Sequence, residues 1–266
     1  MRYVGRTLRL SALVIFSLAL VGCGKLFSAD LPNPSGRYAT YTSDYSPVVL
    51  VILPGGKSIC SGTIVSEVAV LTAAHCALQS GQYQVVTSQG TFVTNQVVYT
   101  GVGDVNSTDD LALLIFQPSH PVASRDDGDS IYGIGSEVSE GQELRLVGYG
   151  CNDIEARRGA GVKRTGTNIV SNISDYIEFL TPKSSTLSSA RMIIGSDNRA
   201  GSCFGDSGGP ALAVSGNSFE VVGVTHAGGS YRDDYISEYV NVATNSHNRQ
   251  WLSQMNSEYD LGIAGL

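Results

Sequence analysis

The sequence predicts an all-β protein, and three observations lead to that class. Glycine is abundant, at 31 of 266 residues, while only 15% of the residues are charged. Short runs rich in Val and Ile recur along the chain between turns that contain Gly, Asn and Ser, and helical periodicity is confined to the end of the chain. Chains of this kind form sandwiches or barrels. An apolar content of 42% is enough to bury a core.

The apolar runs predict the individual elements in order. We expect strands at Val48–Leu53, Ile59–Val65, Val68–Thr72, Tyr83–Thr87, Phe92–Tyr99, Leu111–Phe116, Leu144–Gly148, Ile177–Leu180, Met192–Gly195, Ala211–Val214 and Phe219–Thr225. Near the end of the chain, Asn245 is typical of a helix N-cap, and the helix should continue to about Asn256. Its apolar residues, Trp251, Leu252 and Met255, would share one face.

Residues 1–22 predict an export signal. Arg2, Arg6 and Arg9 precede the apolar stretch Leu10–Val21, whose 12 residues (21 − 10 + 1) are too few for a typical membrane-spanning helix. The stretch ends in Leu-Val-Gly-Cys, which resembles a bacterial lipobox with Cys23 as the lipidated residue. We therefore expect an exported lipoprotein, anchored in the periplasm, at the outer membrane or at the cell surface.

The rest of the chain divides into a tether and one domain. Residues 23–45 contain Pro-Asn-Pro-Ser-Gly and show little periodicity, so they are expected to form a flexible tether. Residues 46–266 are then a single folded domain, expected to be a monomer. The net charge of −7 argues against a nucleic-acid partner. No cluster of residues has metal-ligand spacing, so we expect no metal and no cofactor.

Three short segments carry the chemistry. His75 lies in LTAAHC, Asp110 in DDLALL and Ser207 in GDSGGP, in that order along the chain. A serine hydroxyl is a poor nucleophile alone. It needs a base to remove its proton, and the base needs a carboxylate to hold it in the right tautomer. These segments supply all three groups.

The three segments and their order resemble the chymotrypsin/trypsin-like serine protease family. The resemblance implies two six-stranded antiparallel β-barrels with a short C-terminal helix, and cleavage of peptides or proteins through an acyl-enzyme. His75 would be the general base and Asp110, rather than its neighbour Asp109, its carboxylate partner. The backbone N–H groups of Gly205 and Ser207 would form the oxyanion hole.

Two disulfides are expected among the cysteines of the exported domain. With Cys23 set aside, four cysteines remain, an even number that allows three pairings. The resemblance implies a bridge between Cys60 and Cys76 beside the histidine. It also places the stretch after Gly148 next to the stretch before the nucleophile, which leaves Cys151 to pair with Cys203. The usual family partner of that last cysteine is absent.

The chain departs from the family where activation occurs. Family members free an Ile-Val-Gly-Gly type N-terminus, which pairs with the aspartate before the nucleophile, here Asp206. In this chain the corresponding place near Ser35–Ala39 has no such segment. A buried carboxylate needs a partner. Either the chain is cleaved after Arg37, or Asp206 has an internal partner, or the protein is latent.

The pocket that selects the substrate side chain is the second departure. By resemblance it is formed by Gly201 at the floor, Ser202 beside it, His226 and Gly228. Gly201 stands where trypsin-like enzymes carry an aspartate, which disfavours Lys or Arg. His226 could join Ser202 in binding a glutamate, or it could pack against Asp110 and leave a pocket for small or apolar side chains.

Two other readings of the sequence compete with a trypsin-like protease. Gly205–Gly209 also fits G-x-S-x-G, the nucleophile elbow of α/β-hydrolases, which would need a later acid and base such as Asp233 and His247. The chain before Ser207 lacks the long helices of that fold, and the reading leaves LTAAHC unexplained. The other alternative is a catalytically silent or latent lipoprotein that keeps the fold as a binding or regulatory module.

Overall fold

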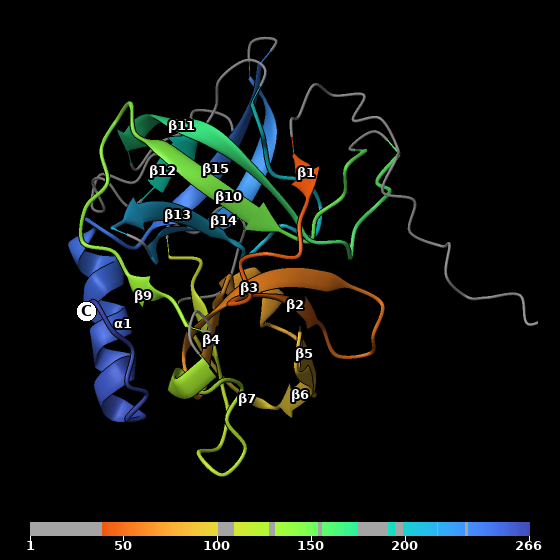
Figure 1. Ribbon diagram of the computed structural model, residues 1–266, viewed down its shortest axis with the longest axis vertical. Coiled ribbons are helices and arrows are strands. Elements are labelled where there is room, and N and C mark those ends of the chain that lie inside the picture. The colour runs from red at the N-terminus through yellow and green to blue at the C-terminus, as the bar shows by residue number, and fades with distance from the viewer. Residues whose placement is uncertain are drawn as a thin grey trace, which may run out of the picture.

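The computed structural model describes residues 39–100, 109–127, 131–153, 156–174, 191–194, 199–216, 218–231 and 234–266. Nearly all of the regular structure is β, arranged as two sheets that pack on each other, with one helix along their side (Figure 1). No helix in the described ranges has the length and apolarity needed to span a membrane. The all-β class predicted from the sequence is confirmed.

The first sheet contains seven strands in the order β6-β5-β2-β3-β4-β8-β7. Their bounds are β2 (Val48–Ile52), β3 (Ile59–Ser66), β4 (Ala69–Thr72), β5 (Tyr83–Thr87), β6 (Gly90–Thr94), β7 (Gln96–Tyr99) and β8 (Ala112–Ile115). The two edge strands, β6 and β7, are separated only by Asn95, so one bent segment joins both edges of the sheet. Counted this way, six segments enclose the first core, in agreement with the family resemblance.

The second sheet contains eight strands, in the order β1-β11-β10-β13-β14-β15-β12 with β9 beside β14. Their bounds are β1 (Thr40–Tyr41), β9 (Gly133–Ile134), β10 (Glu143–Gly148), β11 (Arg164–Ser174), β12 (Arg191–Ile194), β13 (Pro210–Ser215), β14 (Ser218–Tyr231) and β15 (Asp234–Asn241). A further pairing of β11 with β12 closes six of these strands into a ring. Strands β1 and β9 are short additions to this barrel.

The helices of the described ranges are two short 3₁₀ helices and one α-helix: η1 (Ala74–Cys76), η2 (Arg125–Asp127) and α1 (Ser246–Glu258). The predicted cap is confirmed, because the Asn245 side chain accepts a hydrogen bond from the backbone N–H of Asn248. Leu252 is fully buried in the core between the sheets, and Trp251 and Met255 pack against the same core. The helix therefore uses the apolar face that the sequence predicts.

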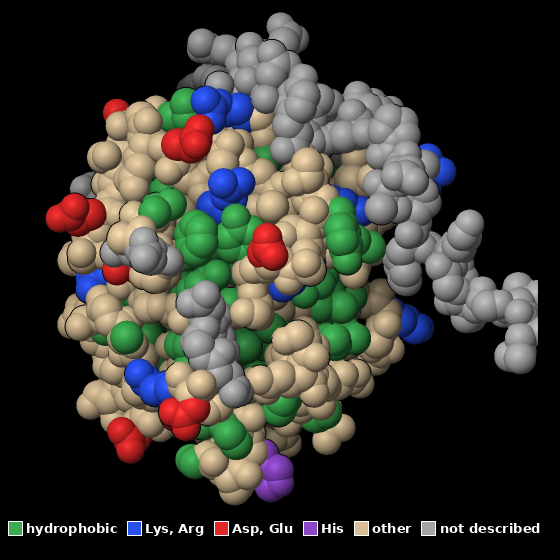
Figure 2. Space-filling model, in the orientation of Figure 1, with side chains coloured by type: hydrophobic (Ala, Val, Ile, Leu, Met, Phe, Trp, Pro, Cys, Tyr) green, Lys and Arg blue, Asp and Glu red, His purple; other side chains and the backbone are tan. Residues whose placement is uncertain are grey.

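Strands β4 and β8 are buried along their whole length, because one face points into the first barrel and the other toward the second. This explains their continuous apolar sequences. Charged side chains of both signs are interspersed over the face shown in Figure 2, with hydrophobic side chains between them. The site described below lies where the two sheets meet.

Strands β11 and β15 were not expected from the sequence. The inward face of β11 carries Gly166, Asn168 and Val170, so apolar alternation is absent. Asn168 satisfies its buried amide locally: its Nδ2 donates to Ala200 O at 2.6 Å and its Oδ1 accepts from Ile169 N at 2.7 Å. The buried residues of β15 likewise include Ser237 and Glu238. A polar strand inside a barrel gives no hydrophobic signal.

The folded domain begins earlier than the predicted residue 46. Thr40 and Tyr41 pair with Thr165 and Arg164 as strand β1, and Tyr45 packs against the core. The tether prediction failed here because Thr and Tyr pair well in strands despite their lack of apolar periodicity. The signal segment, Cys23 and Arg37 lie outside the described residues, as do the predicted strand Ile177–Leu180 and Gly195 of the predicted strand Met192–Gly195.

Candidate active site

His75 sits on the 3₁₀ turn η1, directly after the buried strand β4. The turn is anchored by the disulfide between Cys60 and Cys76, which the resemblance implied and the structure contains. The His75 side chain is 19% exposed, so its ring can reach a substrate while its base is held by packing. A rigid turn of this kind fixes an imidazole without a long supporting helix.

Asp110 contacts His75 through both carboxylate oxygens. Oδ1 accepts a hydrogen bond from the backbone N–H of His75 at 2.8 Å, and Oδ2 lies 2.7 Å from the Nδ1 atom of its ring. Asp110 is fully buried. Burial disfavours its charged form, but hydrogen bonds from His226 and His75 outweigh burial and hold the pKa of Asp110 well below its usual range. An ionised carboxylate only accepts, so Nδ1 of His75 carries the proton and Nε2 is left as the base.

Ser207 lies on a turn of the second barrel that is bound to the first barrel by Ser61 of strand β3. The backbone N–H of Ser61 donates to Ser207 O at 2.8 Å, and its hydroxyl donates to Gly205 O at 2.8 Å. The same hydroxyl accepts from Tyr149 N at 2.9 Å. Ser61 was missed from the sequence, where its position directly after Cys60 was the only available signal.

Glycines at 205 and 208 are required by the backbone of this turn. Gly205 has φ +101° and Gly208 has φ +80°, conformations that other residues rarely adopt. A Cβ on Gly208 would also lie 2.0 Å from Thr72 Oγ1 and 2.4 Å from Ser61 O. The segment GDSGGP is therefore specified by backbone conformation and close packing as well as by its nucleophile.

Two N–H groups of the turn are available to a developing oxyanion. Within the described part of the chain, neither Gly205 N–H nor Ser207 N–H donates a hydrogen bond. Cys76 Sγ lies 3.8 Å from Ser207 O, which places the serine beside the histidine turn. Among the described residues no hydrogen bond joins the Ser207 hydroxyl to His75. Such catalytic contacts often form only when substrate is bound.

Asp206 has partners within the domain. Its Oδ1 accepts from Gly150 N at 2.7 Å, and its Oδ2 accepts from Cys203 N at 2.8 Å. The second disulfide, Cys151–Cys203, joins the two segments that supply these N–H groups, as the resemblance implied. This carboxylate is therefore bound by main-chain groups of both walls of the site.

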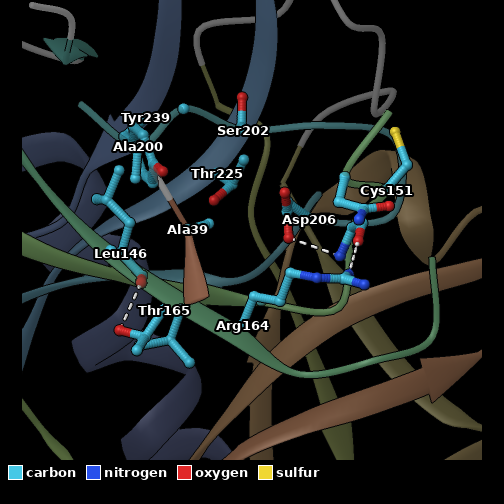
Figure 3. Close-up of a pocket in the computed structure, with 16 residues that line it drawn as sticks. Ala39, Leu146, Cys151, Arg164, Thr165, Ala200, Ser202, Asp206, Thr225 and Tyr239 are labelled. Atoms are coloured by element: carbon cyan, nitrogen blue, oxygen red, sulfur yellow. Dashed lines mark hydrogen bonds between the residues drawn. The ribbon is translucent and has the colours of Figure 1, made fainter. Parts of the chain in front are cut away.

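Arg164 lies in the same small cavity as Asp206, which has a volume of ≈ 40 Å³ (Figure 3). Its Nη1 donates to three carbonyls, Gly150 O at 3.0 Å, Gly159 O at 2.8 Å and Val162 O at 3.2 Å. Burial lowers the pKa of Arg164, and the charge of Asp206 opposes that shift. The domain thus supplies a cation near the carboxylate that the family pairs with a freed N-terminus.

Of the two positions that the sequence allowed for His226, the structure shows the one against Asp110. Its side chain is fully buried, with Nδ1 2.5 Å from Asp110 Oδ2, so it does not reach the substrate pocket. The nearby hydroxyls satisfy each other: Ser202 Oγ donates to Ser237 Oγ at 2.9 Å, and Ser202 N donates to the same oxygen at 2.8 Å. Gly228 is exposed and pairs with Ser237 across strands β14 and β15. No charged group is described at these pocket positions.

Among the described residues, two groups bring metal-type ligand atoms within 4.8 Å of one another. One contains Cys60 and Cys76, which are joined in a disulfide. The other is His75, Asp110 and His226, but there the ring nitrogens lie 2.5 and 2.7 Å from one carboxylate oxygen. Ligand atoms around tetrahedral Zn²⁺ stand about 3.3 Å apart. The spacing in this group is that of hydrogen bonds.

The two-sheet fold and the buried Asp–His pair beside a glycine turn define the class of the serine peptidases with two β-barrels. Comparison with known families agrees, because the model of the Trypsin family matches residues 36–252. This is 217 residues (252 − 36 + 1) of the 266 in the chain. The chain belongs to the trypsin family.

Proposed function

We propose that this protein is a serine endopeptidase that cleaves peptide or protein substrates through an acyl-enzyme. The observation that carries the proposal is the pair of hydrogen bonds from His75 to the buried carboxylate of Asp110. This pair lies where Ser207 is bound to the first barrel through Ser61. A charged, buried carboxylate that orients a partly exposed imidazole is the arrangement a serine nucleophile requires.

Each residue of the site has a definite part in the reaction. The Ser207 hydroxyl oxygen attacks the carbonyl carbon of the scissile bond while Nε2 of His75 takes its proton. The N–H groups of Gly205 and Ser207 stabilise the tetrahedral oxyanion. His75 then gives the proton to the leaving amine, and the acyl-enzyme forms. A water molecule, deprotonated by His75, releases the acyl group and restores Ser207.

The pocket chemistry supports a preference for small or apolar side chains before the scissile bond. Gly201 offers no carboxylate to Lys or Arg, and the hydroxyls of Ser202 and Ser237 are bonded to each other. The burial of His226 against Asp110 removes the group that would have bound a glutamate. A peptide library scored by kcat/KM tests this order of preference, and a preference for Lys, Arg or Glu would contradict it.

The location of the protein is part of the proposal. The lipobox-like segment ending at Cys23 supports export and lipid anchoring on the outside of the inner membrane. The intact mass of the protein extracted from membranes with detergent tests this. A mass matching a chain that begins at an acylated Cys23 is expected, and Cys23→Ser should abolish the acylation and release the protein from the membrane.

The activity is tested by the reaction of the purified protein with a fluorophosphonate, followed by intact mass. One adduct is expected on the wild type and none on Ser207→Ala. Ser253→Ala is the control, since it removes an exposed serine of α1 and should leave the adduct in place. The unlabelled mass also shows where the active chain begins. An adduct on a form that keeps residues before Arg37 would support an internal partner for Asp206. Complete lack of reaction would favour the silent or latent alternative.

A further inference from the structure

A second imidazole contacts the carboxylate that orients the general base. Nδ1 of His226 lies 2.5 Å from Asp110 Oδ2, the same oxygen that lies 2.7 Å from Nδ1 of His75. The planes of the two rings make an angle of 76°, and the ring centroids lie 6.1 Å apart. The side chains of His226 and Asp110 are both fully buried. One carboxylate oxygen is thus shared by two histidines.

An irregularity in strand β14 aims His226 at this oxygen. Thr225 pairs with Tyr239 of β15, whereas Ala227 pairs with Glu238, so His226 is the extra residue of a β-bulge. Bulges redirect a side chain locally and are common beside active sites. Thr225 is itself tied to the nucleophile turn, because its N–H donates to Gly209 O and its carbonyl accepts from Gly208 N, both at 2.8 Å. The bulge therefore connects the nucleophile turn to Asp110.

The chemistry of the three groups defines the contact. A carboxylate that is charged offers only acceptors, so both Nδ1 atoms must carry protons. The Nδ1–H of His226 supplies the second of these donors from a fully buried side chain.

We propose that His226 is a positioning residue, whose Nδ1–H fixes the Asp110 carboxylate so that Asp110 can hold His75 in its reactive tautomer. This inference rests on the proposed peptidase function. It predicts a requirement at position 226 for a buried hydrogen-bond donor, beyond a requirement for volume. Loss of a hydrogen bond to a charged group should slow catalysis by about 10- to 100-fold.

Two variants of His226 distinguish a requirement for a hydrogen-bond donor from a requirement for side-chain volume. In His226→Asn the amide Nδ2 takes the place of Nδ1 as donor, and in His226→Leu a side chain of comparable size has no donor. We expect kcat of the Leu variant to fall by about 10- to 100-fold with KM little changed, and that of the Asn variant to stay within a few-fold of wild type. Equal loss in both variants, or full activity of the Leu variant, would overturn the proposal. His120→Asn, whose ring nitrogen contacts only Ser119 among the described residues, is the control.

A spectroscopic measurement tests the contact without reference to activity. In ¹⁵N-histidine-labelled wild type, two strongly hydrogen-bonded Nδ1–H protons should appear far downfield. One should disappear in His226→Asn, while both should persist in His120→Asn. A single downfield proton in the wild type would refute the shared carboxylate even if no variant folds. Two protons in a protein that does not react with the fluorophosphonate would uphold the contact and favour the silent or latent alternative over an active peptidase.

Discussion

Asp110 and Asp206 are two carboxylates on either side of the nucleophile, and they are held in opposite ways. Asp110 is bound by the rings of His75 and His226 and by one backbone N–H. Asp206 is bound by the backbone N–H groups of Gly150 and Cys203. Side chains supply two of the three hydrogen bonds described for Asp110, whereas main-chain N–H groups, shaped by glycines and a disulfide, supply those described for Asp206.

This difference determines which changes each site can tolerate. At Asp110 the chemistry depends on proton donors that a single substitution can remove. At Asp206 the donors are backbone N–H groups, which nearly any residue type could supply, but there is no room for an added side chain beside the carboxylate. A Cβ on Gly148 would lie 2.1 Å from Asp206 Oδ1, and one on Gly150 would lie 2.2 Å from Oδ2. The first site is sensitive to chemical identity and the second to added volume.

The largest effect is expected from Asp110→Asn. The amide would present an N–H where His75 needs an acceptor, so the histidine would be held in the wrong tautomer. We expect kcat to fall by about 10⁴-fold with substrate binding retained. Steady-state kinetics on a peptide substrate measures this.

The matched control for this variant is Asp109→Asn. Asp109 contacts His247 at 3.3 Å on the surface of the molecule. Its substitution should change kcat by no more than a few-fold. Similar losses in the two variants would mean that the assignment of the acid to Asp110 is wrong.

Gly150→Ala tests the second site by volume alone. The added methyl group would displace the Asp206 carboxylate and with it the turn that carries Gly205 N–H. Loss of one oxyanion donor lowers kcat by about 10²- to 10³-fold, and we expect a loss in that range. Gly133→Ala is the control, because a Cβ there meets its nearest neighbour at an ordinary 3.5 Å. Unchanged kcat in Gly150→Ala would show that Asp206 does not set the oxyanion hole.

The same contrast explains what the sequence could predict. His75, Asp110 and Ser207 stand in short segments whose residue types are chemically necessary, so the sequence identified them as a group. The partners of Asp206 could not be predicted because Gly150 and Cys203 contribute only main-chain N–H groups, which leave no trace in residue type. Arg164 was missed for a related reason, since its role depends on the polar strand β11, which has no apolar periodicity.

His226 shows a different limit. The sequence allowed its side chain either to line the pocket or to pack against Asp110. These two positions lie on opposite faces of the same strand. A single bulged residue decides between them. Register within a sheet is set by pairing along the whole strand, and no local pattern at 225–228 records it.

Arg164→Met should reduce both stability and kcat, by less than the two variants above, because Arg164 lies beside Asp206. The guanidinium donates to three carbonyls, one of them in Gly150, whose N–H donates to Asp206. Loss of hydrogen bonds from a charged donor costs about 2 kcal/mol. We expect a lower unfolding midpoint in urea and a roughly 10-fold loss of kcat through displacement of Asp206. Arg164→Lys should not restore either, because a single ammonium cannot reproduce the planar fork.

The control for this pair of variants is Arg199→Met. Arg199 is bonded to Glu143 near the surface, where an ion pair contributes about 0–1 kcal/mol. An unfolding midpoint of Arg164→Met equal to that of Arg199→Met would show that Arg164 contributes no more than a surface charge.

The smallest expected effect concerns Lys163, the neighbour of Arg164, and extends the comparison to a partly buried cation. Its Nζ donates to Tyr45 O at 2.9 Å and to Asp44 O at 3.3 Å. Burial lowers the pKa of Lys163 from its usual 10.5 to about 8, with the charge of Asp44 opposing. Between those two pH values the unfolded chain holds a proton that the folded chain has released. The contribution of this residue to stability therefore rises with pH across that window.

Tyr149, whose ring lies 5.7 Å from Lys163 Nζ, acts in the opposite direction at higher pH. Burial raises its pKa from the usual 10.0 to about 12, so its contribution to stability falls with pH over that interval. Urea midpoints at pH 8, 9 and 10 in the Ser207→Ala background, with and without Lys163→Met, isolate the lysine. The stability gained by replacing Lys163 with Met should shrink as pH rises. The reason is that the Lys163 ammonium, which main-chain carbonyls stabilise poorly, loses its proton in the folded protein. A constant difference would mean that the two carbonyls stabilise this ammonium as well as water does.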